Sequence, residues 1–275
     1  MNRRDFGGVV LGTAMAASAG SAVAADDEPV VQVCEHRFPM MHTGRKPEIG
    51  MLVYPGLTLM DTLGPQTALS TSCNVHLVWK NAGLIESDTG LVIRPTGTFA
   101  DCPKDLDAIF VGGGPGQIAV MSDPEALTFL ADRGARAKYV TSVCSGSLVL
   151  GAAGLLQGYK ASCHWALHSA IALFGAIPEQ ERVVTDRNRV TGGGVTAGLD
   201  FALTLLAKLL SDDIAKMTQL ALEYDPQPPF DAGTPAKAGE KITKLVQDWV
   251  GPLGETFAKT CVASSKEMSK YAPKP

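Results

Sequence analysis

The feature that most constrains this chain is the regular alternation of short apolar runs with segments of helical periodicity. Apolar runs that end in turns are typical of buried strands, and the segments between them have the spacing of helices. We expect strands at 49–54, 74–79, 106–111 and 138–143 and helices at 63–70, 124–136, 148–156 and 197–210. Strands that alternate with helices form a mostly parallel sheet with helices on both faces. The sequence therefore predicts an α/β fold.

The first 25 residues have the composition of a targeting segment rather than of a folded domain. Arg3 and Arg4 precede an uncharged stretch rich in Gly and Ala, and Ala22-Val23-Ala24 is typical of a signal-cleavage site. Paired arginines before a weakly apolar stretch are typical of twin-arginine signals. The stretch is too short and too weakly apolar to favour the alternative of a membrane anchor. We therefore expect export to the periplasm, with no membrane attachment after cleavage of the signal peptide.

The rest of the chain divides into an arm, a main domain and a C-terminal helical extension, at residues 26–46, 47–230 and 231–275. The arm contains prolines and scattered charges without a clear period. Within the extension, residues 236–270 have the periodicity of one amphipathic helix, with Leu245, Trp249 and Phe257 on its apolar side. We expect both flanking parts to be accessories to one domain.

Charge and cysteine usage exclude several classes of function. The 275 residues carry a formal net charge of -4 with a pI of about 5.7, which disfavours nucleic acid as a partner. The extension offers one helix rather than a DNA-binding module. Six cysteines are too few for a disulfide scaffold in a chain of this length, and no two form a Cys-x-x-Cys motif. One of the cysteines is therefore a candidate for catalysis.

Cys144 occupies the position expected of a catalytic nucleophile. It follows the strand at 138–143 and precedes the helix at 148–156, with Gly146 in the turn between them. A strand, a nucleophile, a glycine and a helix in this order are typical of a nucleophile elbow, which presents the side chain at the carboxyl edge of a sheet. The amino end of the following helix should lower the pKa of the thiol. The alternative is an inert buried cysteine.

Asp61 is the second candidate, because it lies in the otherwise apolar stretch 57–63 after the first strand. Burial of a carboxylate is unfavourable, so its pKa should be raised and part of the acid form retained near neutral pH. Beside a thiolate, such an acid would donate a proton to the substrate and later activate water. The alternative is an N-cap for a helix that begins near Gly64.

Residues 112–116 form a glycine-rich loop after the third expected strand. Its spacing differs from that of a dinucleotide-binding loop, and Pro115 removes an N–H group that a pyrophosphate would use. We expect the backbone N–H groups of Gly113, Gly114 and Ser145 to form an anion hole beside the thiol. The alternative is a tight turn without a binding role.

His164 and His168 lie four residues apart and would share one face of a helix. Two imidazoles without a third ligand do not make a metal site, so we expect a structural role for the pair and no bound metal. The glycines at 192–194 are expected to connect a strand to the helix at 197–210 and to serve packing.

Taken together, several segments resemble isonitrile hydratases of the PfpI, or class I glutamine amidotransferase-like, superfamily. The similarity extends over residues 47–239 and is specific as a set rather than in any single motif. The segments that carry it are DTLGP at 61–65, GGGPG at 112–116, VCSGS at 143–147, GAAGLL at 151–156, HW at 164–165, VTGGGVTAGLD at 190–200, EYDP at 223–226 and PPFDAG at 228–233.

The resemblance implies a flavodoxin-like three-layer sandwich, a homodimer, and no metal or other cofactor. It implies a cysteine-dependent hydro-lyase that adds water to a small-molecule isocyanide, R–NC, to give an N-formamide, R–NH–CHO. Carried over to this sequence, it makes Cys144 the nucleophile and Asp61 its acidic partner, with Ser145 beside the sulfur. Attack of the thiolate on the isocyanide carbon would give a thioimidate, from which water would release the formamide.

Two features depart from the hydratase pattern. Ser145 stands where hydratases usually carry threonine and protease-like members carry histidine. Because no histidine adjoins the sulfur, Ser145 argues against a Cys-His dyad and against peptidase chemistry. The predicted export signal is the second departure, since the hydratases are cytosolic enzymes.

Two other functions fit the same residues. An exported ligand-binding or thiol redox-sensing protein of this fold would be oxidised reversibly at Cys144 and would form no product. A cysteine hydrolase that acts on an amide or a nitrile would need a general base near Cys144, which the sequence does not indicate.

Overall fold

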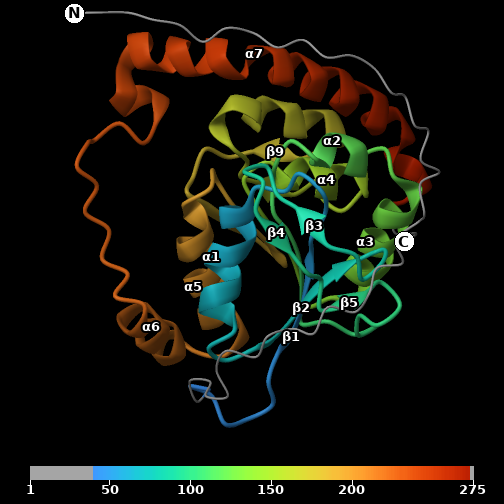
Figure 1. Cartoon of the computed structure of the whole chain (residues 1–275), viewed down its shortest axis with the longest axis vertical. Coiled ribbons are helices and arrows are strands. Elements are labelled where there is room, and N and C mark those ends of the chain that lie inside the picture. The colour runs from blue at the N-terminus through green and yellow to red at the C-terminus, as the bar shows by residue number, and fades with distance from the viewer. Residues whose placement is uncertain (1–39, 273–275) are drawn as a thin grey trace, which may run out of the picture. The chain divides into compact units, whose positions relative to one another are not determined.

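A seven-stranded sheet forms the centre of the protein, shown in Figure 1 as a computed structural model that describes residues 40–272. Its strands are β1 (Glu48–Leu52), β2 (Asn74–Trp79), β5 (Gly97–Thr98), β6 (Ala108–Val111), β7 (Tyr139–Val143), β10 (Val183–Asp186) and β11 (Arg189–Gly192). They lie in the order β10-β11-β7-β6-β1-β2-β5, and every neighbouring pair is parallel except β10 and β11. The prediction of a mostly parallel sheet is confirmed. The predicted signal peptide and the first part of the arm lie outside the described residues.

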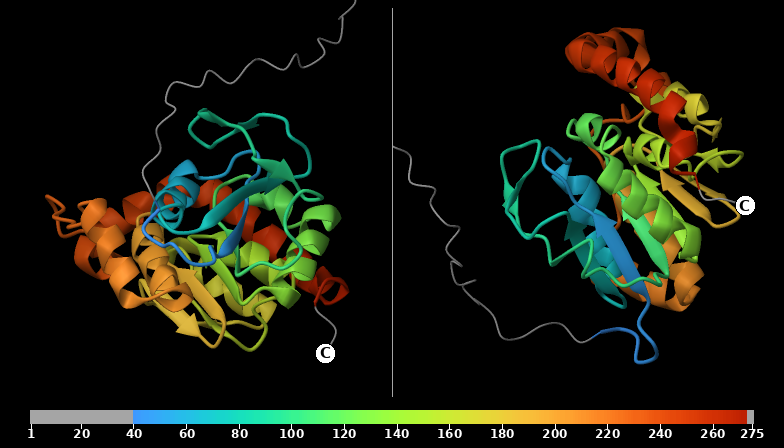
Figure 2. Two further views of the ribbon diagram at one scale, coloured as in Figure 1. Left: turned by 90° about the horizontal axis from the view of Figure 1, so that it is seen from below. Right: turned by 90° about the vertical axis from the view of Figure 1, so that its right-hand side faces the viewer.

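Helices lie on both faces of the sheet and make a three-layer α/β sandwich (Figures 1 and 2). Their bounds are α1 (Leu59–Leu69), α2 (Gln117–Val120), α3 (Pro124–Arg136), α4 (Gly146–Ala152), the 3-10 helix η1 (Trp165–Phe174), α5 (Ala197–Leu209), α6 (Asp212–Ala221) and α7 (Pro235–Glu267). On one face α5 packs between α1 and α6, whereas α4 contacts α3, η1 and α7 on the other. Two short sheets complete the fold, β3 (Ile85–Glu86) with β4 (Val92–Ile93) and β8 (Lys160–Ala161) with β9 (Ile177–Pro178).

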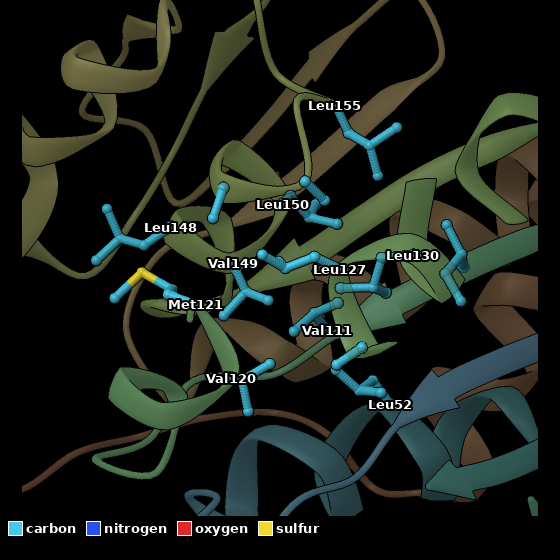
Figure 3. Close-up of a cluster of buried hydrophobic side chains, with 14 of the residues drawn as sticks. Leu52, Val111, Val120, Met121, Leu127, Leu130, Leu148, Val149, Leu150 and Leu155 are labelled. Atoms are coloured by element: carbon cyan, nitrogen blue, oxygen red, sulfur yellow. The ribbon is translucent and has the colours of Figure 1, made fainter. Parts of the chain in front are cut away.

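The core is divided by the sheet into two buried clusters. On the face of α5, Phe110 of β6 lies against Phe201, with 5.4 Å between the ring centroids. On the opposite face, Leu52 of β1 and Val111 of β6 belong to the cluster that Leu130 of α3 completes (Figure 3). Side chains of a strand point alternately to its two faces, so strands covered on both sides are apolar throughout. This explains why the central runs of the sequence show no alternation with polar residues.

Helix α1 begins at Leu59, four residues before the predicted start at residue 63. Thr58 occupies the N-cap position in an extended conformation, and Pro65 lies inside the helix. The side chain of Thr58 makes no capping hydrogen bond, so this helix start lacks the capping signal by which a sequence usually marks it. Asp61 therefore lies within the first turn of α1, and its interpretation as an N-cap is wrong.

Helix α6 has no counterpart among the predicted helices. Ser211 caps it by accepting a hydrogen bond from the N–H group of Ile214, and Asp212 and Asp213 lie in its first turn. These are sequence signals of a helix start. The α6 helix packs against α5 and so extends the same layer.

The C-terminal extension forms α7 and a final 3-10 turn, η2 (Met268–Lys270), instead of one continuous helix. Gly239 has φ 77° and ψ 167° and interrupts α7 near its start. Phe257 is 5% exposed and lies in the core, but Leu245 is 57% exposed and Trp249 81% exposed. The predicted apolar side is thus buried only in the second half of the helix. Among residues 40–272, no helix has the length and apolar character needed to span a membrane.

Candidate active site

The candidate active site lies at the carboxyl edge of the sheet, where open parallel α/β folds bind their ligands. Asp61 lies beyond β1, Gly113 beyond β6, Cys144 beyond β7 and Gly193 beyond β11. Two hydrogen bonds connect these turns, from the N–H group of Gly113 to Asp61 and from the N–H group of Cys144 to the Gly193 carbonyl. Four segments that are distant in sequence therefore meet at one edge.

Cys144 has the strained backbone of a nucleophile elbow. Its φ of 60° lies in the left-handed region that non-glycine residues rarely adopt. Its N–H group donates to the carbonyl groups of Gly192 at 3.1 Å and Gly193 at 2.7 Å, which hold this conformation. Gly146 follows as the first residue of α4, where a Cβ atom would lie 2.2 Å from the carbonyl oxygen of Val111. The tight approach of the turn to β6 explains why a glycine stands there.

Asp61 is fully buried in the first turn of α1. Its Oδ2 atom accepts a hydrogen bond of 2.8 Å from the N–H group of Gly113, and its Oδ1 atom has no hydrogen-bond partner in the described part of the chain. Burial raises the pKa of Asp61 to about 7, while the Gly113 N–H group and the Cys144 thiol act in the opposite direction. Asp61 can therefore both donate and accept a proton near neutral pH, as its apolar surroundings predict.

The thiol of Cys144 has a raised pKa, which is contrary to the prediction from the helix that follows it. Burial is the main cause, and the negative charge of Asp61 and the nearby Cys163 add to it. A hydrogen bond from the N–H group of Ser145 acts in the opposite direction. The short α4 helix does not offset the loss of water around the sulfur. Cys144 is consequently held as a neutral thiol beside Asp61.

The glycine loop fixes the side chains around Cys144. The N–H group of Gly113 donates to Asp61, and the N–H group of Gly114 donates to Ser145 Oγ at 3.3 Å. A Cβ atom at Gly113 would lie 2.4 Å from Ser145 Oγ and 2.9 Å from Asp61 Oδ2. Two of the three amides expected in the anion hole thus bind side chains, while that of Ser145 faces the sulfur. An anion that used the other two would have to displace Asp61 and Ser145.

Two buried polar residues at this edge were not among the predicted site residues. Tyr54 follows β1, and its hydroxyl donates a hydrogen bond of 2.8 Å to the carbonyl of Gly112. Its pKa is raised well above the usual value, first by burial and then by Asp61 and Cys144. Gln117 begins α2 and is fully buried, and neither polar atom of its side chain has a partner among residues 40–272. The polar tip of Tyr54, at the end of an apolar run, was the available signal.

The two histidines lie near the site, at the start of a 3-10 helix instead of along an α-helix. His164 is the N-cap of η1, and its Nδ1 atom accepts a hydrogen bond of 3.3 Å from the N–H group of Ala166. His168 lies buried within η1. In the described ranges of the chain, no three residues of the types His, Cys, Asp and Glu are grouped as metal ligands.

Comparison with known proteins identifies the family of this chain. Residues 48–208 match the DJ-1/PfpI family, within the main domain expected at 47–230. The isonitrile hydratase of Pseudomonas putida is 52% identical over 207 residues, which cover 74% of this chain and 90% of that enzyme. The crystal structure of a ThiJ/PfpI family protein from Pseudomonas syringae has a TM-score of 0.77 and 47% identity, and the match covers 84% of this chain and 98% of that protein.

A transcriptional regulator shares part of the same similarity. The HTH-type regulator GbdR of Pseudomonas aeruginosa is 36% identical over 135 residues, which cover 48% of this chain but 36% of the regulator. The likeness is therefore confined to a minor part of the regulator's length. The hydratase match spans most of both proteins, and the family match includes the turns that carry Asp61, Gly113 and Cys144. The chain belongs to the DJ-1/PfpI family.

Proposed function

We propose that this protein is an isonitrile hydratase, which adds water to an isocyanide R–NC to form an N-formamide R–NH–CHO. The observation that carries the proposal is the meeting of the buried Asp61 carboxyl, whose pKa is about 7, and the Cys144-Ser145 turn at the glycine loop, where Gly113 donates to Asp61 and Gly114 donates to Ser145. An isocyanide carbon must receive both a nucleophile and a proton, and this pair supplies both. The 52% identity to the Pseudomonas putida hydratase supports the same conclusion.

In the first half of the proposed reaction, the sulfur of Cys144 attacks the terminal carbon of the isocyanide. Ionised Asp61 takes the thiol proton as the C–S bond forms, and then delivers it to the same carbon. The product is the thioimidate Cys–S–CH=N–R, and Asp61 is again ionised. Because the thiol is neutral at the start, proton transfer to Asp61 accompanies the attack instead of preceding it.

In the second half, water attacks the carbon of the thioimidate. Asp61 takes a proton from this water as the C–O bond forms and delivers it to the nitrogen, which gives the intermediate Cys–S–CH(OH)–NH–R and leaves Asp61 ionised again. The C–S bond then breaks, the hydroxyl becomes the formyl oxygen, and its proton returns to the sulfur. The N–H group and hydroxyl of Ser145 adjoin the sulfur and the glycine loop, where they can orient the attacking water. One water is consumed and the thiol is regenerated.

A thiol redox sensor or a ligand-binding protein of the same fold is the alternative. The thiolate is the form of cysteine that reacts with oxidants. Burial of Cys144 raises its pKa and reduces the thiolate fraction, which argues against a sensor of oxidants. Asp61 next to the thiol is also better suited to proton transfer than to redox sensing.

The proposal is tested by mixing residues 26–275 with an aryl isocyanide and following the N-formamide by absorbance and mass spectrometry. Cys144→Ala should form no product, whereas Cys73→Ala, at another buried cysteine, should retain turnover. Product formed by Cys144→Ala would contradict the role of the nucleophile. No product from the wild type, with a thiol that still alkylates, would contradict the proposed function.

We also propose that the protein acts in the periplasm as a homodimer. The twin-arginine pattern supports export, and the exposed apolar side chains of Met60 and Leu63 on α1 support a contact between copies. Replacement of Arg3 and Arg4 by lysine should retain the protein in the cytoplasmic fraction. Light scattering of residues 26–275 should give twice the mass of one chain, and a monomer would contradict the dimer.

A further inference from the structure

A cavity of about 860 Å³ lies beside the turn that carries Cys144. It is bordered by the β11–α5 turn, the start of η1 and the start of α7, and its lining includes Gly194, His164, Trp165, His168, Thr243 and Gln247. The isocyano group has two atoms, and a cavity of this size accommodates a drug-sized ligand. Cys144 and Asp61 are not among the residues that line it, so the cavity can hold the part of a substrate that lies away from the reacting group.

The wall of this cavity is continuous with the backbone of Cys144. The carbonyl group of Gly193, a residue that lines the cavity, accepts a hydrogen bond of 2.7 Å from the N–H group of Cys144. The N–H group of His164, which also lines the cavity, donates to the carbonyl group of Cys144 at 3.2 Å. A ligand in the cavity would thus contact residues that are themselves bonded to the reacting cysteine.

One wall of the cavity carries a buried hydrogen-bonding group without a partner. His168 is 8% exposed, and its Nε2 atom has no hydrogen-bond partner within residues 40–272. Buried polar atoms without partners are rare because they have lost their bonds to water. His164, in contrast, uses its Nδ1 atom to accept from Ala166. His168 lines the cavity while this nitrogen is shielded, so a rotation of the ring is needed before a polar group of a ligand can bind it. Trp165 offers an aromatic surface for the apolar part of the ligand.

Another wall belongs to the C-terminal extension. Thr243 and Gln247 lie on α7, outside residues 48–208 that match the family. A hydrogen bond of 3.4 Å from Thr243 Oγ1 to the carbonyl of Pro235 spans the break at Gly239 and shapes the start of α7. Neither Thr243 nor Gln247 belongs to the buried core. Thr243 and Gln247 can therefore affect function by lining the cavity, whereas they contribute little to the core.

We infer that this cavity binds the R group of the isocyanide, and that the substrate carries a large ring system with a hydrogen-bonding group that His168 recognises. This inference rests on the proposed function and specifies its substrate class. The start of α7 is then a specificity wall, with Thr243 limiting the size of R. Aromatic R groups are favoured because they pack against Trp165 and lose little conformational freedom when bound.

The inference is tested by comparing three substrates: tert-butyl isocyanide, biphenyl-4-yl isocyanide and its 4′-hydroxy derivative. The wild type should show a value of kcat/KM about tenfold higher for the biphenyl compounds than for the tert-butyl compound. Thr243→Trp should lower this ratio about tenfold by filling the cavity. Lys259→Trp, at an exposed position of α7 outside the cavity, is the matched control and should leave the ratio unchanged.

His168→Phe keeps a ring but removes the nitrogen. It should lower kcat/KM for the hydroxylated biphenyl about three- to tenfold relative to the unsubstituted biphenyl, as expected for one hydrogen bond. If His168→Phe leaves the ratio of kcat/KM for the hydroxylated and unsubstituted biphenyl compounds unchanged, the role of His168 is overturned. An unchanged size preference in Thr243→Trp, or an equal change in Lys259→Trp, would overturn the role of the cavity.

A measurement without turnover separates this inference from the proposed function. N-(4′-hydroxybiphenyl-4-yl)formamide should slow the alkylation of Cys144 by iodoacetamide in the wild type and should do so less in Thr243→Trp. If the protein hydrates tert-butyl isocyanide but the formamide does not protect Cys144, the substrate-binding role of the cavity is overturned and the proposed hydratase function stands. Absence of hydration for all three isocyanides would overturn the hydratase itself.

Discussion

The turn at Cys144 and residues 235–254 of α7 lie near the same cavity but are built in opposite ways. Around the turn, Gly113 and Gly146 lie where a Cβ atom would overlap neighbouring atoms. In α7, Trp249 is largely exposed and Gly254 has open space around it. The reacting groups are thus fixed by close packing, whereas the outer wall of the cavity has room to vary. The proposed chemistry and the proposed substrate selection thus depend on regions that should differ in their tolerance to substitution.

The sharpest test of this contrast exchanges one glycine in each region for alanine. Gly146→Ala places a Cβ atom against the Val111 carbonyl and should destabilise the protein by about 4 kcal/mol, with loss of turnover. Gly254→Ala meets no neighbour and should stabilise it by about 0.5–1 kcal/mol through helix propensity. Urea denaturation measures both changes. Equal changes in the free energy of unfolding for the two variants would show that the two regions do not differ in packing.

Asp61→Asn tests the chemistry of the packed region. Loss of the proton carrier should reduce kcat/KM by about 10²–10⁴-fold without unfolding the protein. In the wild type, kcat/KM should rise with pH through about 7, because ionised Asp61 accepts the thiol proton. The variant should lack this rise. The control is Asp213→Asn on the exposed start of α6, and a wild-type pH profile in Asp61→Asn would refute the assignment.

The two halves of α7 should differ in their contribution to stability. Phe257→Ala removes a buried ring and should lower the free energy of unfolding by about 3–5 kcal/mol. Trp249→Ala removes an exposed ring and should change it by less than about 0.5 kcal/mol. Thermal or urea denaturation measures the difference. A large loss in Trp249→Ala would show that the exposed half is also part of the stable core.

Burial of Asp61 should also make stability depend on pH. Its pKa of about 7 in the folded protein lies above the ordinary value of 3.8, so folding favours the protonated form. The stability from this group is complete below pH 3.8 and is lost as the pH rises towards 7, because the unfolded chain releases this proton while the folded protein retains it. Between pH 5 and pH 8 the wild type should lose about 2 kcal/mol more than Asp61→Asn. Parallel urea-denaturation profiles would contradict this.

The parts of the site that follow from local sequence were predictable. The turn at Cys144 depends on a strand, a glycine two residues later and a helix, all of which are adjacent in the chain. The raised pKa of Asp61 was predictable for the same reason, since its neighbours in sequence are apolar. The helix at 124–136 also begins at Pro124, after an Asp123 cap that the sequence displays.

The parts that depend on distant segments were not predictable. The pKa of Cys144 is raised because the surrounding elements exclude water from the sulfur, which outweighs the local effect of α4. Gly113 donates to Asp61 across 52 positions of sequence, so its amide is engaged where an anion hole was expected. The exposure of Trp249 likewise depends on which elements reach α7, and periodicity alone cannot show this.

The exposed half of α7 gives the protein a surface on which directed evolution can act. Random substitution at residues 240–247 would sample one wall of the cavity while leaving the hydrogen bonds of Asp61 and Cys144 intact. Libraries confined to this short segment should retain folding in most members, because the side chains concerned are mainly exposed. Selection from such libraries for activity on new isocyanides would then require changes in residues 240–247 only.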